Sequence, residues 1–204
     1  METWVRCGSA ALDEGDTMAR VCVLLAKGFE EIEAITVVDV LRRADIEVWT
    51  LGVSSISIAG AHGIVVEADA LLREEADAKW DAVICPGGLP GAHHLRDDEA
   101  VQRLLRAQDR SGRWLGAICA APIALAKAGI LRGRNVTCYP GFEDELEGAN
   151  VVEAPVVIDR NLITSRGPAT ALAFAFALVS ELGDKKIAES LKISTLYNEL
   201  MEGL

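Results

Sequence analysis

The sequence predicts an α/β protein whose core is a parallel, doubly wound sheet sandwiched by helices. Two observations support this prediction. Apolar segments of strand length alternate along the chain with segments that repeat with a helical period. The strand segments are continuous apolar runs, as in strands that are buried on both faces. Ligands bind such sheets beyond the carboxyl ends of the strands, so we expect functional residues in those loops.

The predicted strands begin at Arg20. Residues 20–26 form the first apolar run, and residues 54–67 are expected to form a short hairpin around Gly60 and Gly63. The triplet Asp159–Asn161 supplies the turn between the last two strands. The other predicted strands cover residues 46–52, 80–88, 113–119, 135–140, 149–161 and 162–167.

The predicted helices place charges and stop signals where helices favour them. The helix over residues 30–44 begins with acids and ends with arginines, which suits the helix dipole. Its expected inward stripe consists of Ile32, Ile35, Val38 and Leu41. The helix over residues 168–183 begins with proline and stops at glycine. The remaining predicted helices cover residues 97–112, 120–131 and 185–200.

Composition excludes several classes of protein. A formal net charge of −11 argues against a nucleic-acid partner, which requires clustered Lys and Arg. No apolar run reaches the roughly 20 residues that span a bilayer, so we expect no membrane partner. The five cysteines are an odd number without metal-ligand spacing, which favours free thiols in the cytoplasm. We therefore expect neither a metal nor a cofactor.

Residues 1–18 do not match the predicted fold. They lack the apolar centre of a secretion signal, and their one arginine stands among several acids. We expect residues 1–18 to be a flexible extension, with Met18 as a possible alternative start, and residues 19–204 to be a single domain.

Cys119 is the main candidate nucleophile. It stands where a predicted strand gives way to a helix, and the small residues Gly116, Ala117, Ala120 and Ala121 surround it. A sharp nucleophile-bearing turn requires small neighbours. The start of the following helix is expected to lower the thiol pKa and so favour the thiolate. The alternative is a buried core cysteine, which is the commoner fate of a free cysteine.

Two further groups are candidates for the same site. The backbone N–H groups at Gly87 and Gly88 are expected to approach a ligand closely and, with that of Ala120, to bind an oxyanion. A Pro-Gly-Gly segment is, however, usually only a turn. Glu33 lies among apolar positions of its helix, which suggests that its side chain points inward. A carboxyl beside a thiolate does not easily ionise as well, so we expect a raised pKa for Glu33. A solvated helix face is the alternative for Glu33.

The chain resembles the ThiJ/PfpI superfamily, in the branch of the human Parkinson-disease protein (DJ-one) and its bacterial relatives. The resemblance covers roughly residues 19–200 and rests on AKGFEEIE, VDVLRRA, PGG-x-x-GA, GAICAAP and SRGP in this order. It implies a flavodoxin-like sandwich that forms a homodimer. It also implies that Cys119 is the reactive cysteine, Glu33 its protonated partner, Gly88 and Ala120 the oxyanion-binding amides, and Arg43 a residue near the dimer interface.

The chain departs from the human pattern at two positions. Tyr139 occupies the place of a histidine near the reactive cysteine, as in bacterial members, so a histidine-assisted mechanism is not expected. Gly87 and Tyr139 are then expected to line the substrate pocket. His62 replaces an arginine near the subunit interface, where we expect a weaker or pH-dependent anion site together with Arg43.

Two classes of function follow from these residues. One is a glutathione-independent glyoxalase or protein deglycase that acts on methylglyoxal, glyoxal or their protein adducts, in defence against oxidative and carbonyl stress. The other is a redox-sensing stress protein or chaperone, switched by oxidation of Cys119 to the sulfinate. A protease or amidotransferase is disfavoured because Ala120, not a histidine, follows Cys119 and no histidine follows His94.

Overall fold

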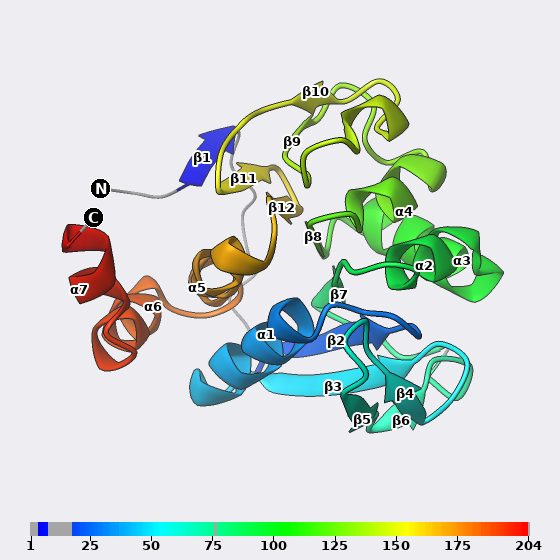
Figure 1. Ribbon diagram of the computed structural model, residues 1–204, viewed down its shortest axis with the longest axis horizontal. Helices are drawn as coiled ribbons and strands as arrows, with labels where there is room; N and C mark the ends of the chain where they lie inside the picture. The colour runs from blue at the N-terminus through cyan, green and yellow to red at the C-terminus, as the bar shows by residue number, and fades with distance from the viewer. Residues whose placement is uncertain (1–3, 8–17, 76, 204) are drawn as a thin grey trace.

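The computed structural model describes residues 4–7, 18–75 and 77–203 (Figure 1). Eight strands form the central sheet in the order β1-β11-β12-β8-β7-β2-β3-β6. Only the β11–β12 pair is antiparallel, so the predicted, mostly parallel sheet is confirmed. The strands are β1 (Trp4–Cys7), β2 (Arg20–Leu25), β3 (Glu47–Gly52), β6 (Ala70–Leu71), β7 (Ala82–Cys85), β8 (Trp114–Ile118), β11 (Val156–Asp159) and β12 (Leu162–Ser165).

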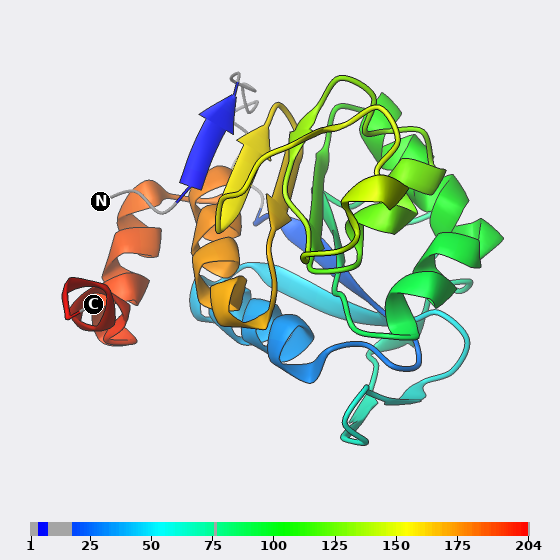
Figure 2. The same cartoon turned by 45° about the horizontal axis from the view of Figure 1, so that its top comes forward.

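Helices cover both faces of this sheet. Figure 2 shows α1 (Glu31–Arg43) beside α5 (Ala171–Leu182) on one face, with α3 (Glu99–Arg110) and α4 (Pro122–Lys127) on the other. The remaining helical segments are α2 (Gly91–Asp97), α6 (Lys185–Ser194), α7 (Tyr197–Glu202), η1 (Glu143–Glu145) and η2 (Pro168–Thr170). None of the described helices is long and apolar enough to cross a membrane.

Two small sheets flank the central one. The predicted hairpin is present as the antiparallel pair β4 (Ser57–Ala59) and β5 (Val65–Glu67). The pair β9 (Asn135–Val136) and β10 (Asn150–Val151) is parallel. The β4–β5 hairpin lies against the start of α1, because the Ala61 N–H donates to Phe29 O at 2.8 Å.

The chain reverses its direction of travel across the sheet between β2 and β7. From β2 it moves outward to β3 and β6, and then returns past β2 to β7 and β8. All residues of β7 and β8 are buried, as are Val21–Leu25 of β2, so the loops that follow these strands start from a rigid core. The carboxyl ends of neighbouring parallel strands at such a reversal form the usual ligand crevice.

Four predictions about the elements are wrong. Residues 149–161, expected to form one strand, form β10 in a small sheet and β11 in the central sheet. Residues 4–7, expected within a flexible extension, pair with β11 as an edge strand, since four residues can complete an open sheet edge without any helical or strand pattern; residues 1–3 and 8–17 lie outside the described residues. Residues 185–200 are two helices, because Leu196 adopts a left-handed conformation with φ 59°. In α1, Ile32 and Ile35 are 56% and 42% exposed rather than inward.

Candidate active site

Cys119 lies directly after β8, on the expected strand-to-helix turn. Its φ of 63° is a conformation that side chains other than glycine rarely adopt. Two backbone hydrogen bonds hold it: Cys119 N–H donates to Ser165 O at 2.9 Å, and Tyr139 N–H donates to Cys119 O at 2.9 Å. The strained turn is thus fixed by two neighbouring segments, as is common at functional sites.

Glu33 reaches the same site from the first turn of α1. Its side chain has no exposed surface, and its Oε2 accepts the Gly87 N–H at 2.8 Å. Its Oε1 is buried without a hydrogen-bond partner among the described nitrogen and oxygen atoms, and the carboxyl interacts with the Cys119 thiol. The structure therefore excludes the solvated-face interpretation of Glu33 and places its free oxygen in the thiol's surroundings.

Gly87 allows the thiol and the carboxyl to approach each other. A Cβ at this position would lie 2.6 Å from the Cys119 Cβ and 2.7 Å from Glu33 Oε2, closer than real Cβ atoms come. The Gly87 N–H is already bonded to Glu33, so it is not free for an oxyanion. The Gly88 and Ala120 N–H groups instead face the Cys119 sulfur, and by donating to it they favour the thiolate.

The two ionisable groups of the site both have raised pKa values. Burial raises the pKa of Glu33 to about 7, against the opposing effect of the Cys119 thiol and the Gly87 N–H. Burial and the Glu33 carboxylate raise the pKa of the Cys119 thiol to about 12. The sequence-based prediction of a lowered thiol pKa is therefore wrong: Cys119 is only 9% exposed, and α4 has just six residues and begins at Pro122.

These pKa values describe a coupled pair. With a pKa of about 7, the Glu33 carboxyl is partly ionised at neutral pH while the Cys119 thiol keeps its proton, so the carboxylate is available to accept that proton. Proton transfer between the two groups therefore requires no exchange with bulk water. Such a pair is suited to an attack by sulfur that is coupled to proton transfer onto Glu33.

Tyr139 is linked to Cys119 through its backbone, and its side chain lies beside Gly167. It is 46% exposed, and its ring lies over Gly167, where a Cβ would be 3.1 Å from Tyr139 Cδ2. Its neighbour Cys138 is fully buried, and burial raises the pKa of that thiol to about 11. The described cysteines Cys22, Cys85, Cys119 and Cys138 are all free thiols.

Arg43 and His62, predicted together as an interface or anion site, lie at opposite ends of α1. Arg43 is the last residue of the helix and pairs with Asp39 at 2.8 Å. His62 contacts Glu30 and Glu31 at the start of α1, and this end of the helix lies ~18 Å from Arg43 along the helix axis. Two carboxylates beside His62 disfavour an anion there. Sequence reasoning missed this cluster, whose only signal was the glycine-flanked segment Gly60–Gly63.

The chain has extensive similarity to known proteins. The sequence profile of the DJ-1/PfpI family matches residues 19–181. Protein dj-1beta of Drosophila melanogaster is 41% identical over 181 residues, which cover 86% of this chain and 97% of that protein. The glutathione-independent glyoxalase DJR-1.2 of Caenorhabditis elegans is 37% identical over 166 residues, covering 80% and 88%. The chain spans about two fifths of DJ-1 homologs B and A of Arabidopsis thaliana, 40% and 44% of their lengths.

Solved structures share the fold as well as the sequence. Drosophila melanogaster DJ-1beta superposes with a TM-score of 0.86 at 38% identity, covering 88% of this chain and 98% of that chain. Oxidized Toxoplasma gondii DJ-1 gives a TM-score of 0.84 at 33% identity, covering 87% and 98%. The helix-flanked, mostly parallel sheet and the matched motifs agree, and the chain belongs to the DJ-1/PfpI family.

Proposed function

We propose that the chain is a glutathione-independent glyoxalase or protein deglycase that acts on α-oxoaldehydes in cytoplasmic stress defence. The observation that carries the proposal is the meeting of the Cys119 sulfur, the buried Glu33 carboxyl and the Gly88 and Ala120 amides at one strand end. The C. elegans relative named as a glutathione-independent glyoxalase supports the same chemistry. No cofactor is required by these steps.

In the first step the Cys119 sulfur attacks the aldehyde carbon of methylglyoxal or glyoxal. A carbon–sulfur bond forms, the carbonyl electron pair moves to oxygen, and the thiol proton passes to the Glu33 carboxylate. The Gly88 and Ala120 N–H groups, which face the sulfur, lie close to the oxygen that gains charge. Glu33 then gives this proton to the oxygen, so the product is a neutral hemithioacetal attached to Cys119 and Glu33 is again a carboxylate.

In the following steps Glu33 moves a proton from the former aldehyde carbon to its neighbour through an enediol. One carbon is oxidised while the other is reduced, so no external oxidant is required. The resulting thioester of a 2-hydroxy acid is hydrolysed by water, which restores the Cys119 thiol. When the aldehyde is carried as a hemiaminal on a protein amine, the sulfur displaces the amine: the carbon–sulfur bond forms, the carbon–nitrogen bond breaks, and the thiol proton passes through Glu33 to the leaving amine. The same hemithioacetal results, and the later steps are unchanged.

The proposal is tested by D-lactate production from methylglyoxal in the absence of glutathione. Wild type is expected to exceed the background of Cys119→Ala. The matched control is Cys138→Ala, because Cys138 is also buried but interacts with Glu143 and Arg166 rather than with Glu33. Wild-type lactate at the Cys119→Ala background, with both proteins folded, contradicts the proposal.

A second candidate function is a redox-sensing stress protein or chaperone. The buried, unpartnered Oε1 of Glu33 favours it, since a protonated carboxyl there would donate to a Cys119 sulfinate and hold oxidation at that stage. Two equivalents of peroxide would oxidise the thiolate to the sulfinate and be reduced to water. Mass spectrometry after mild peroxide treatment, together with the lactate assay, separates the candidates. Selective formation of a Cys119 sulfinate without lactate production favours the sensor, and absence of the sulfinate argues against the sensor.

We also propose that a second copy of the chain binds the exposed face of α1. Ile32 and Ile35 are large apolar side chains on this surface, and Arg43 lies on the same helix. A homodimer would remove both isoleucines from water. Light scattering is expected to give twice the chain mass for wild type and the monomer mass for Ile35→Asp; a wild-type monomer contradicts the proposal.

A further inference from the structure

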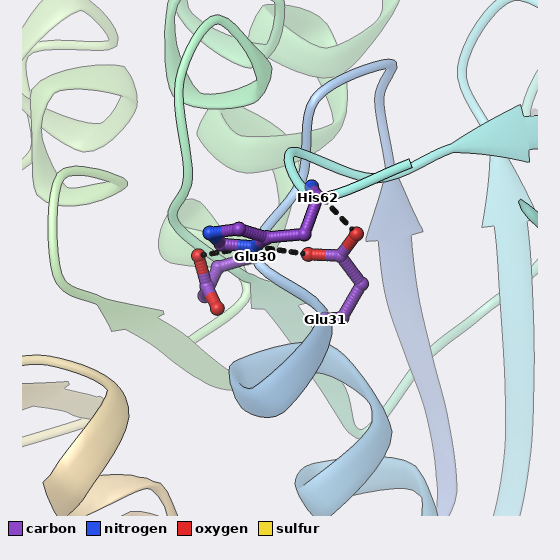
Figure 3. A group of neighbouring side chains, drawn as sticks. All are labelled: Glu30, Glu31 and His62. Carbon is purple, nitrogen blue, oxygen red and sulfur yellow. Dashed lines mark hydrogen bonds and ion pairs between the residues drawn. The ribbon is translucent and has the colours of Figure 1, made fainter. Parts of the chain in front are cut away.

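Glu30, Glu31 and His62 form a compact cluster at the start of α1 (Figure 3). Their ligand-type atoms all lie within 4.8 Å of one another. The two carboxylates come from the start of α1, and the imidazole comes from the turn between β4 and β5. The cluster therefore joins two separate segments of the fold, and it combines an imidazole with carboxylates.

Backbone groups orient Glu31 within this cluster. Its Oε1 accepts the N–H groups of His62 at 2.8 Å and Ile64 at 3.3 Å. Gly60 makes room for the carboxylate, since a Cβ there would lie 2.4 Å from Glu31 Oε1. The other oxygen, Oε2, faces His62 Nδ1 at 2.9 Å. Outer-shell hydrogen bonds of this kind fix the carboxylate ligands of metal sites.

The cluster has an excess of negative charge. The Glu30 and Glu31 side chains are only 12% and 7% exposed, and within the described part of the chain both form ion pairs with His62 alone. A protonated His62 compensates one of the two carboxylates and leaves the other. The start of α1 adds roughly half a positive charge, which does not cancel the remainder. The cluster therefore attracts a cation.

The spacing of the three side chains suits a small metal ion. His62 Nδ1 lies 2.9 Å from Glu31 Oε2 and 3.6 Å from Glu30 Oε2. Two ligands that are each about 2.1 Å from a tetrahedral ion lie about 3.4 Å apart, which is close to both distances from His62 Nδ1, and the Glu30 and Glu31 oxygens lie no more than 4.8 Å apart. His62 is 68% exposed, which leaves the site open to solvent.

We propose that Glu30, Glu31 and His62 bind a divalent metal ion, with Zn²⁺ as the preferred ion and water completing its coordination. Zn²⁺ accepts imidazole and carboxylate ligands together, whereas Ca²⁺ and Mg²⁺ prefer oxygen alone. This proposal differs from two sequence-based predictions: that His62 belongs to an anion site, and that the protein binds no metal. The site is independent of the proposed glyoxalase chemistry, because none of its ligands takes part in those steps.

Zn²⁺ binding is measured by calorimetry on the full chain carrying Cys119→Ala, which removes the reactive thiol as a competing ligand. We expect one Zn²⁺ per chain, and at least about tenfold weaker binding when His62→Gln is added. The matched control is His93→Gln, a histidine of α2 outside the cluster, which should bind as the background protein does. Absence of binding, or equal binding by the His62→Gln protein, overturns the proposal.

Two further measurements guard against misinterpretation. Glu30→Gln leaves the backbone hydrogen bonds of Glu31 intact, so this variant should fold normally and still bind Zn²⁺ more weakly; unchanged affinity overturns the three-ligand site. Co²⁺ loaded into the same background protein should show no thiolate-to-metal charge-transfer absorption. Such a band would place the ion on a remaining cysteine and would also overturn the proposal.

Discussion

Glu31 and Glu33 are two residues apart at the start of α1, yet their environments shift their pKa values in opposite directions. Burial acts to raise both. For Glu31, hydrogen bonds from the His62 ring and the His62 and Ile64 N–H groups outweigh burial and lower the pKa. For Glu33, hydrogen bonds with the Gly87 N–H and the Cys119 thiol do not outweigh burial, and the pKa rises to about 7.

The comparison teaches that burial and the number of donors together decide which carboxylate stays ionised: three donors outweigh burial at Glu31, whereas one backbone donor and a thiol do not at the fully buried Glu33. A carboxylate with several donors is stable as an anion and serves as a structural anchor or ligand. A carboxylate with one backbone donor is poised to exchange a proton near neutral pH, which suits acid–base chemistry. The two faces of a single helical turn thus support two different kinds of chemistry.

The largest expected effect is that of Glu33→Gln, which removes the poised carboxyl but keeps its shape. Loss of general acid–base catalysis is expected to lower the rate of lactate formation from methylglyoxal by roughly 10²- to 10⁴-fold. Steady-state kinetics measure the change, with Glu67→Gln on the exposed surface of β5 as control. A Glu33→Gln enzyme as fast as wild type would show that Glu33 transfers no proton.

Gly87→Ala tests whether close approach creates the difference between the two carboxylates. The new Cβ would displace the Cys119 and Glu33 side chains, so we expect an activity loss of roughly 10²-fold. Overpacking should also cost about 1–3 kcal/mol of unfolding free energy in urea. Gly203→Ala, whose Cβ would lie at an ordinary 3.4 Å from its nearest atom, should change neither quantity. An unaffected Gly87→Ala protein would argue against the crowded geometry.

Glu31→Ala examines the anchoring role of the other carboxylate. It leaves the His62 and Ile64 N–H groups without their acceptor, and because both residues are exposed, water replaces part of the interaction, so the expected cost is about 1 kcal/mol. Urea unfolding in the presence of a chelator measures this cost free of any metal effect. Glu74→Ala, a change at a residue with a single long 3.4 Å hydrogen bond to Leu71 N–H, is the comparison. Equal stability of the two variants would show that the Glu31 carboxylate does not stabilise the fold.

Asp159 extends the comparison to a carboxylate far from the site. Burial acts to raise its pKa, but the Asn135 N–H and the Arg160 guanidinium hold the pKa below its usual value. A lowered folded-state pKa means that ionised Asp159 stabilises the fold at neutral pH and loses this effect as the pH falls below ~3.9. Asp159→Asn should therefore cost about 1 kcal/mol at pH 7 and less in acid.

Urea unfolding of wild type and Asp159→Asn between pH 7 and pH 3 measures this difference. Asp144→Asn changes an exposed aspartate and serves as the control. A stability gap that stays constant or widens toward low pH would show that Asp159 does not act through its charge.

The residues of the candidate site were predicted from sequence more accurately than their pKa values. Cys119, Glu33 and the two amide donors were predicted from local composition and the family motifs, and the structure brings them together. The thiol pKa was predicted with the wrong sign. Helix position is visible in a sequence, whereas burial and a carboxylate 86 residues away in the chain are not.

The sequence by itself determined most of the order of strands and helices from Arg20 onward, the turn at Cys119 and the family, because apolar periodicity, glycines and short motifs are local signals. Only the tertiary structure decided that Ile32 and Ile35 face outward while Glu33 faces inward, and that His62 meets Glu30 and Glu31. These outcomes depend on contacts between distant segments. The Glu33–Gly87 hydrogen bond, for example, joins residues 54 positions apart, and no local pattern specifies which segments will meet.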